Sequence, residues 1–314
     1  TMVAGNRQAR PNLRADGCPF CPGSGRVPDN YDVFKYDNDF PALSQHPDEP
    51  DVAGSDLSPV APNYGKCEVI LYSPDHEASL HDLSVAHLTR LVDLWTERQE
   101  ALSADPRIKY IFPFENRGEE VGVTMKHPHG QIYAYPFVPL KIQTELNSAR
   151  AWHDEHGTCL FCQLTRDELQ DKRRLVTSNQ SFVAYVPSFT DYPYGVFVVS
   201  RFHKGSLTEF DAQERTDLAR ILKVITGGFD VLFNRRFPYM MCMHQTPVNS
   251  PEYAGCARSY HFHIEFYPPL RSENTIKYYA SSEMGAWAAC NPLRVEDTTP
   301  TLAGACQRFE QSSD

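Results

Sequence analysis

One order of residues occurs twice along the 314-residue chain, and it constrains the fold more than any other feature. Each copy has a Cys-x-x-Cys pair, a β-rich segment followed by a histidine, a segment of helical periodicity and a His-x-His pair. In the first copy, 109 residues separate Cys18 from His127; in the second, 102 residues separate Cys159 from His261. A repeat of this length predicts two copies of one structural unit.

The repeat predicts an α+β fold made of two tandem halves, residues 1–150 and 151–314, with antiparallel sheets and flanking helices. Strands are expected at 67–72 and 196–200, where apolar and β-branched residues dominate. Apolar residues at helical spacing follow each of these strands. The composition further predicts a surface loop over 40–66, a helix over 141–156 that links the halves, and an irregular tail after residue 291.

The nine cysteines bear on two questions, the cellular compartment of the protein and whether it binds a metal ion. An odd number, in a chain whose start has no apolar secretion segment, predicts a cytoplasmic protein without a disulfide framework. The pairs Cys18/Cys21 and Cys159/Cys162 have the spacing of a metal knuckle or a redox motif. Prolines and glycines flank them, where a redox motif would open a helix after a strand. Metal binding is therefore favoured, and unrelated thiols are the alternative.

Charge and hydropathy exclude two classes of partner. The chain carries 30 Lys and Arg against 40 Asp and Glu, a formal charge of −10. No basic block is present to neutralise phosphates, which argues against a nucleic-acid partner. No apolar run approaches the roughly 20 residues that a membrane-spanning helix needs. An anionic substrate would have to be held by local cations against this overall charge.

The two histidines of the His-x-His pair in the first copy could have different roles, one as a metal ligand and one in catalysis. On a strand, His127, His129 and Gln131 would share one face, and Pro128 and Gly130 would allow a close approach to the backbone. The simplest interpretation is a pair of core histidines. One imidazole could instead complete a tetrahedral Cys2His2 zinc site, leaving the other as nucleophile or base. The remaining ligands of that site would be Cys18, Cys21 and His76.

These motifs resemble those of the galactose-1-phosphate uridylyltransferases, of the histidine-triad superfamily. The matching segments are CPFC, ILYSPDH, FENRG, HPHGQIYAYP, FPYMMCMHQTPVN and FHIEFYPPLRS, in family order over nearly the whole chain. The resemblance implies a UMP exchange between UDP-glucose and galactose 1-phosphate, through a uridylyl-histidine intermediate. It also implies a homodimer that binds a UDP-sugar and a hexose 1-phosphate.

The resemblance assigns roles to individual residues. His129 matches the nucleophile, Gln131 matches the glutamine that holds the transferred phosphoryl group, and His127 is left for the zinc site. Nine further positions match family contacts to base, ribose, phosphates and sugar, although each could be an ordinary surface residue. They are Arg7, Arg10, Phe20, Asn38, Asp39, Asn116, Thr124, Lys277 and Glu283.

The second copy departs from the first where Glu265 stands in place of Gln131, so we expect that half to be structural. Two metal sites compete there. The repeat predicts a second zinc site at Cys159, Cys162, His203 and His261, and we favour it. Family members that lack the second cysteine pair imply instead an iron or zinc site at Glu145, His244, His263 and Glu265.

Two other functions remain open. A related transferase or phosphorylase could use the same nucleophile with an ADP-linked donor or a different acceptor, because Lys126 and Ser282 depart from common family residues. A zinc-binding module without catalysis is the other alternative, but it would have no need of Gln131 or the N-terminal arginines.

Overall fold

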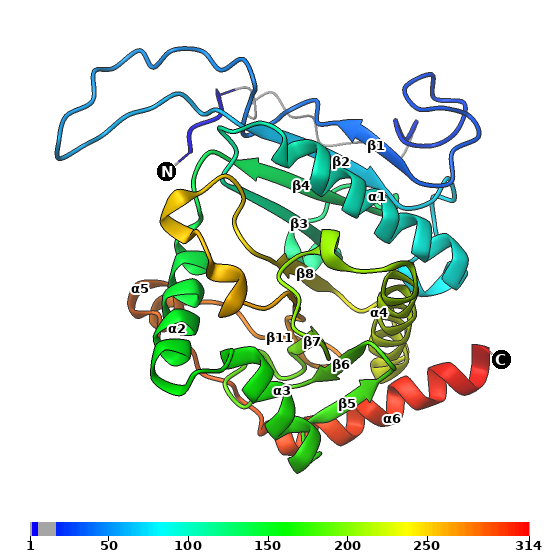
Figure 1. The fold of residues 1–314 in the computed structure, drawn as a ribbon. Helices are drawn as coiled ribbons and strands as arrows, with labels where there is room; N and C mark the ends of the chain where they lie inside the picture. Colours follow the sequence, from blue (N-terminus) through cyan, green and yellow to red (C-terminus); the bar gives the residue numbers. More distant parts are fainter. Residues whose placement is uncertain (1, 6–16, 314) are drawn as a thin grey trace.

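A computed structural model describes residues 2–5 and 17–313, and a nine-stranded antiparallel sheet dominates it. The strand order is β1-β2-β4-β3-β8-β9-β7-β6-β5, in which each strand runs antiparallel to its neighbours (Figure 1). The strands are β1 (Phe34–Asp37), β2 (Lys66–Leu71), β3 (Tyr110–Arg117), β4 (His129–Tyr135), β5 (Leu175–Ser178), β6 (Phe182–Tyr185), β7 (Val196–Ser200), β8 (Tyr239–His244) and β9 (His263–Tyr267). A separate hairpin joins β10 (Leu270–Ser272) to β11 (Thr275–Ile276).

The two copies of the repeat meet where β3 pairs with β8. Around this junction β4, β3, β8 and β9 form a row in which Gln131 pairs with Phe114, Phe114 with Cys242, and Cys242 with Glu265. Gln131 and Glu265 therefore occupy equivalent ends of one row across four strands. The register agrees with the correspondence that the sequence repeat predicts between these two residues.

Three long helices cover one face of the sheet: α1 (Val85–Ser103), α4 (Ala212–Phe233) and α6 (Val295–Ser313) (Figure 1). The first two confirm the helices expected after the predicted strands. Ser84 caps α1, and Asp211 with Glu214 forms a capping box on α4.

Helix α6 corrects the prediction of an irregular tail after residue 291. It packs against α4, where Gly228 leaves room for Cys306 and Gly227 for Phe309; a β-carbon at either glycine would clash with that side chain. Leu302 is fully buried in the same core. Pro300 and several threonines weaken the helical pattern in the sequence, so the groove on α4 is what makes this segment a helix.

The opposite face is covered in the second half by α2 (Leu140–His156) and α3 (Leu160–Asp171). Helix α2 confirms the predicted linking helix and runs through residue 150, the expected boundary between the halves. Cys159 is the residue at the N-cap position of α3, so the second cysteine pair does open a helix, although it follows a helix and not a strand. Shorter helices are α5 (Ser281–Ala286) and the 3-10 turns Leu80–Asp82, Glu119–Val121, Leu207–Glu209, Pro251–Tyr253 and Cys256–Arg258.

The segment expected as a surface loop contains neither helix nor strand until β2 begins at Lys66. An isolated bridge between Ser44 and Tyr64 closes it. Among the described residues, no helix has the length and apolarity needed to cross a bilayer.

Candidate active site and metal clusters

His129 is the first residue of β4, and its imidazole is held by the backbone. Nδ1 lies 2.8 Å from the carbonyl oxygen of His127, to which it donates a hydrogen bond. This bond places the ring proton on Nδ1 and the lone pair on Nε2. The arrangement is the one that a nucleophilic imidazole requires.

The expectation that His127 also lies on this strand is wrong, because β4 begins at His129. His127 is 1% exposed and directs Nδ1 toward Cys21, whereas His129 and Gln131 are half-buried on one face of the strand. The neighbour that approaches the Gly130 backbone is Tyr72, whose hydroxyl occupies the place of a β-carbon. The two histidines of the motif are thus separated into two environments.

Aromatic and amide side chains surround the face that carries His129. The Phe20 ring lies 6.0 Å from the His129 ring and 5.3 Å from the Tyr36 ring. Asn38 donates from Nδ2 to Gln131 Oε1 at 3.5 Å. Phe20, Asn38 and Gln131, which the sequence places far apart, therefore lie together beside His129.

A cavity of about 470 Å³ adjoins the His127–His129 segment. Asn116, one of the predicted phosphate contacts, lines it together with Lys126 and Arg236. Thr124 is exposed on the neighbouring loop and is not among the lining residues. Glu115 also lines this cavity, and burial raises the pKa of its carboxyl to about 7.

The first cysteine cluster assembles as predicted. Cys18, Cys21, His76 and His127 bring one ligand atom each within 4.8 Å of the others. Cys21 Sγ lies 3.4 Å from His76 Nδ1 and 3.6 Å from His127 Nδ1. His127 Nε2 is 2.8 Å from the Ser73 carbonyl, which fixes its proton on Nε2 and leaves Nδ1 as the ligand.

The second cysteine cluster repeats this geometry with Cys159, Cys162, His203 and His261. Cys162 Sγ lies 3.3 Å from His203 Nδ1 and 3.4 Å from His261 Nδ1. The outer nitrogens again bind neutral partners: His203 the Ala257 carbonyl at 2.5 Å, and His261 the Ser200 hydroxyl at 2.7 Å.

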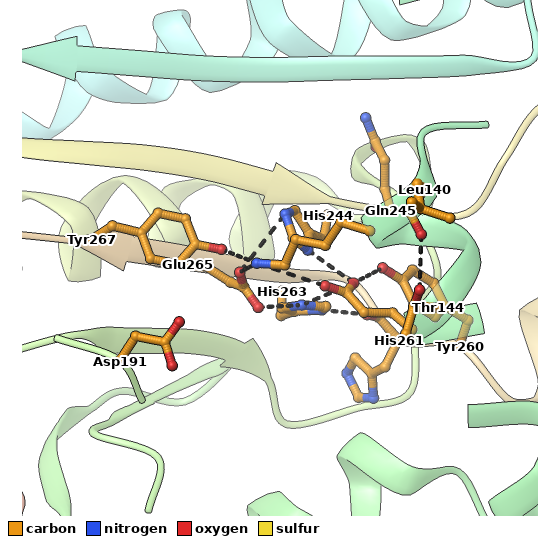
Figure 2. A network of polar contacts seen from close by, with 12 residues as sticks. Leu140, Thr144, Asp191, His244, Gln245, Tyr260, His261, His263, Glu265 and Tyr267 are labelled. Atoms are coloured by element: carbon orange, nitrogen blue, oxygen red, sulfur yellow. Dashed lines mark hydrogen bonds and ion pairs between the residues drawn. The ribbon is translucent and has the colours of Figure 1, made fainter. Parts of the chain in front are cut away.

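The third cluster, Glu145, His244, His263 and Glu265, also assembles, so the two sets that competed in the sequence coexist in the structure. Figure 2 shows His244, His263 and Glu265 of the third cluster close together. His244 Nδ1 lies 2.9 Å from Glu145 Oε2, and His263 Nε2 lies 3.4 Å from Glu265 Oε1. Burial would raise the pKa of the Glu265 carboxyl, but His244, His263 and Lys141 hold it well below its usual range.

Five predicted contacts remain. Lys277 and Glu283 lie 3.9 Å apart, and neither lines the cavity beside His129. Asp39 accepts from Arg26 at 3.0 Å and from the Tyr36 hydroxyl at 2.9 Å. The last two predicted contacts, Arg7 and Arg10, fall outside the described residues.

Sequence reasoning missed three residues of this region. Glu115 and Tyr72 lie within the FENRG and ILYSPDH segments, but only the packing shows that the Tyr239 hydroxyl donates to Glu115 at 3.1 Å and that Tyr72 lies under Gly130. The sequence does not indicate that Lys141 contacts Glu265, because a lysine at this position is typical of the surface of an amphipathic helix.

Comparison with known proteins identifies the family. The profile of the galactose-1-phosphate uridyl transferase N-terminal domain matches residues 4–139, and that of the C-terminal domain matches residues 145–286. The chain belongs to the galactose-1-phosphate uridylyltransferase family. The family enzyme of Thermotoga maritima is 37% identical over 91% of this chain and 88% of its own length. That of Rattus norvegicus is 35% identical over 91% of this chain and 74% of its own.

Solved structures agree with this family assignment. A uridylyltransferase structure superposes with a TM-score of 0.88 at 31% identity, covering 96% of this chain and 94% of its own. An ADP-glucose phosphorylase from Arabidopsis thaliana shares the fold, with a TM-score of 0.79, 23% identity and coverage of 95% and 92%. Uridylyltransferases and a phosphorylase thus share one architecture. The fold alone does not distinguish the two reactions, so the residues of the site have to be considered.

Proposed function

We propose that the chain transfers a uridylyl group between UDP-glucose and galactose 1-phosphate, with His129 as the nucleophile. The observation that carries the proposal is the bond from His129 Nδ1 to the His127 carbonyl, with Gln131 on the same strand face. A neutral imidazole held in this way is prepared to attack phosphorus through Nε2. The family's named activity is the same reaction.

The exchange proceeds in two displacements. In the first, Nε2 of His129 attacks the α-phosphorus of UDP-glucose; an N–P bond forms, the P–O bond to the β-phosphate breaks, and glucose 1-phosphate leaves. In the second, a phosphate oxygen of galactose 1-phosphate attacks the uridylyl-histidine, the N–P bond breaks and UDP-galactose leaves. Gln131 is a neutral donor, so it can hold the phosphoryl oxygen without adding a charge that repels it.

The residues around His129 divide between the two parts of the donor. We infer that Phe20 and Asn38, with Asp39, contact the uridine, and that Asn116 and Thr124 contact the phosphates. Arg7 and Arg10 are proposed as further phosphate contacts. Lys277 and Glu283 do not line the cavity beside His129, so we infer that they serve the sugar phosphate of a second copy of the chain in a homodimer.

We infer that zinc occupies the two Cys2His2 clusters. Thiolate and imidazole donors in tetrahedral number suit zinc, and four protein ligands leave no open position for a substrate. The role of the metal would therefore be structural. All nine cysteines are free thiols, which is consistent with the reducing cytoplasm as the place of action.

The test is the covalent intermediate. The metal-loaded protein is incubated with UDP-glucose labelled at the α-phosphate, and a base-stable, acid-labile protein adduct is expected. His129→Asn should abolish the adduct, whereas His46→Asn, an exposed histidine outside the site, should leave it unchanged. Galactose 1-phosphate should discharge the adduct as UDP-galactose.

The other outcomes separate the remaining functions. Discharge by inorganic phosphate alone would replace the transferase proposal by a phosphorylase. An adduct formed from ADP-glucose in preference to UDP-glucose would change the nucleobase. No adduct from either donor, with a full metal content, would overturn catalysis at His129 and favour a zinc-binding module.

A further inference from the structure

The third cluster differs from the two cysteine clusters because a cationic side chain is bonded to it. Lys141, in the first turn of α2, donates from Nζ to Glu265 Oε2 at 2.6 Å and also contacts the Tyr267 hydroxyl. The same ammonium lies 3.9 Å from Glu145 Oε1. It therefore contacts both carboxylates that a metal ion would use.

The oxygens of these carboxylates already have partners. Glu145 Oε2 accepts from His244 Nδ1 at 2.9 Å and from the Tyr260 hydroxyl at 2.7 Å. Glu265 Oε2 accepts from Lys141. Figure 2 shows His244, His263 and Tyr260 gathered around this network, with Tyr267 at its other end. A metal ion bound to the same oxygens would have to displace Lys141 and Tyr260 and take the Nδ1 proton of His244. His263 Nε2, in contrast, is buried and has no hydrogen-bond partner in the part of the chain that the structure describes.

The two Cys2His2 clusters have no such cation. Among the described residues, no lysine or arginine is hydrogen-bonded or ion-paired to their ligands. The outer nitrogens of His127 and His261 bind the Ser73 carbonyl and the Ser200 hydroxyl, and that of His76 lies 3.8 Å from Glu77 Oε1. No bonded lysine or arginine of the described chain therefore competes with a metal ion for these ligands, whereas at the third cluster a lysine already offsets one of two negative charges.

Electrostatics disfavours a divalent ion at Glu265 while Lys141 is bonded to the same carboxylate. Glu265 is 4% exposed and His263 is fully buried, so their charges are poorly screened by water, although the Lys141 side chain itself is 57% exposed. A divalent ion on Glu265 would lie close to the ammonium bonded to the same carboxylate and would be repelled by it. The donor set alone would suit zinc or iron, but the residues around it do not fit a metal.

We propose that the ammonium group of Lys141 takes the place of a metal ion at the Glu145–His244–His263–Glu265 cluster. Of the three clusters in the described part of the chain, the two Cys2His2 clusters then bind metal and this one does not. The ion pair between Lys141 and Glu265 also connects the first turn of α2 to β9. Helix α2 is the helix that links the halves. A lysine thus performs the structural task that a metal would perform there.

The test counts metal ions and identifies their ligands. Wild type and Lys141→Met, purified with zinc and then exposed to Co²⁺, are compared by elemental analysis and by cobalt absorption. Cobalt at the third cluster would give d–d bands without thiolate-to-metal charge transfer, which distinguishes it from cobalt on cysteine. Wild type should show no such site, and Lys141→Met should gain one ion per chain, bound at least about tenfold more tightly than by wild type.

Two control variants and a stability measurement complete the test. Lys141→Arg keeps the charge, and Lys66→Met removes a lysine ion-paired to Asp37 elsewhere; neither should gain a site. Added Co²⁺ should raise the Tm of Lys141→Met but not that of zinc-loaded wild type. If Lys141→Met cannot be purified, Lys141→Gln undergoes the same comparison.

A third, sulfur-free metal site in wild type would overturn the proposal, as would a Lys141 variant that folds and gains none. The result depends on the difference in metal ions per chain between the Lys141 variant and wild type. It is therefore independent of whether the cysteine clusters hold zinc and of whether His129 is catalytic.

Discussion

The His129 imidazole donates a hydrogen bond to the carbonyl oxygen of His127, the residue that closes the first cysteine cluster. The second half repeats this bond between His263 and the His261 carbonyl, at 3.0 Å. In both halves a cluster ligand orients the next histidine. In the first half that histidine is His129, the proposed nucleophile. The His127 carbonyl therefore connects the first cysteine cluster to the orientation of the nucleophile.

Removing a ligand of the first cluster should therefore reduce both stability and reaction rate. We expect Cys21→Ser to lose one zinc per chain and more than about 2 kcal/mol of unfolding free energy. Adduct formation should slow because the His127 carbonyl is no longer fixed. Elemental analysis, urea unfolding and single-turnover kinetics measure these effects.

Cys290→Ser, which alters an exposed cysteine outside the clusters, is the control and should change none of the three. Cys162→Ser should lose one zinc and stability but form the adduct at nearly the normal rate. Equal slowing by Cys162→Ser and Cys21→Ser would contradict the link through His127.

A charge at Gln131 should oppose catalysis. Gln131→Glu creates the residue that the second half carries at the equivalent position, Glu265. A carboxylate there would repel the transferred phosphoryl group, and we expect kcat/KM to fall about 10²-fold or more. Steady-state kinetics with UDP-glucose measures the loss. Gln131→Met, which lacks the charge, should retain more activity, and the reverse order would argue against repulsion as the cause.

Stability should depend on pH through Glu115. Its carboxyl has a pKa of about 7 in the folded chain and an ordinary value of 4.5 when unfolded. The unfolded chain therefore releases this proton first, and the free energy of unfolding falls as pH rises from about 4.5 to 7, by about 3 kcal/mol at most. Glu115→Gln cannot ionise and should remove that part of the slope. Urea unfolding at pH 5 and pH 8 measures the difference, and an unchanged slope would show that Glu115 is ionised throughout.

The groove that seats α6 should tolerate no added methyl group. Gly228→Ala would place a β-carbon against Cys306, and we expect a loss of about 1–3 kcal/mol. Gly304→Ala, in α6 itself, meets only Arg308 at 3.5 Å and should be neutral or stabilising by up to about 1 kcal/mol. Thermal unfolding of both variants tests the packing. A stable Gly228→Ala would mean that α6 does not seat there.

Motifs of fixed spacing in the sequence were sufficient to predict which residues form the cysteine clusters. The Cys-x-x-Cys and His-x-His pairs predicted both cysteine clusters, because each pair keeps its residues close whatever the fold does. The strands near Cys67 and Val196 and the helices after them followed from side-chain period. The division of the chain near residue 150 and the roles of the site residues stay predictions.

Other features depended on partners that the sequence does not reveal. Helix α6 has a weak pattern, and it is the groove at Gly227 and Gly228 that accepts it. Lys141 is an exposed helix lysine, and only the packing of α2 against β9 shows that its ammonium bonds Glu265. Glu115 stands in a readable motif, but its raised pKa comes from burial, which depends on the whole sheet and helix layer.

The sequence by itself determined that two copies of one unit exist and that each supplies cysteines and histidines in one order. Only the tertiary structure decided how the second copy uses them. His261 precedes β9 and turns to the cysteines, while His263 begins the strand and faces Glu265, so both clusters form without sharing a residue. Spacing along the chain is a covalent property, but the direction in which each side chain points is set by where the strand begins and what packs against it.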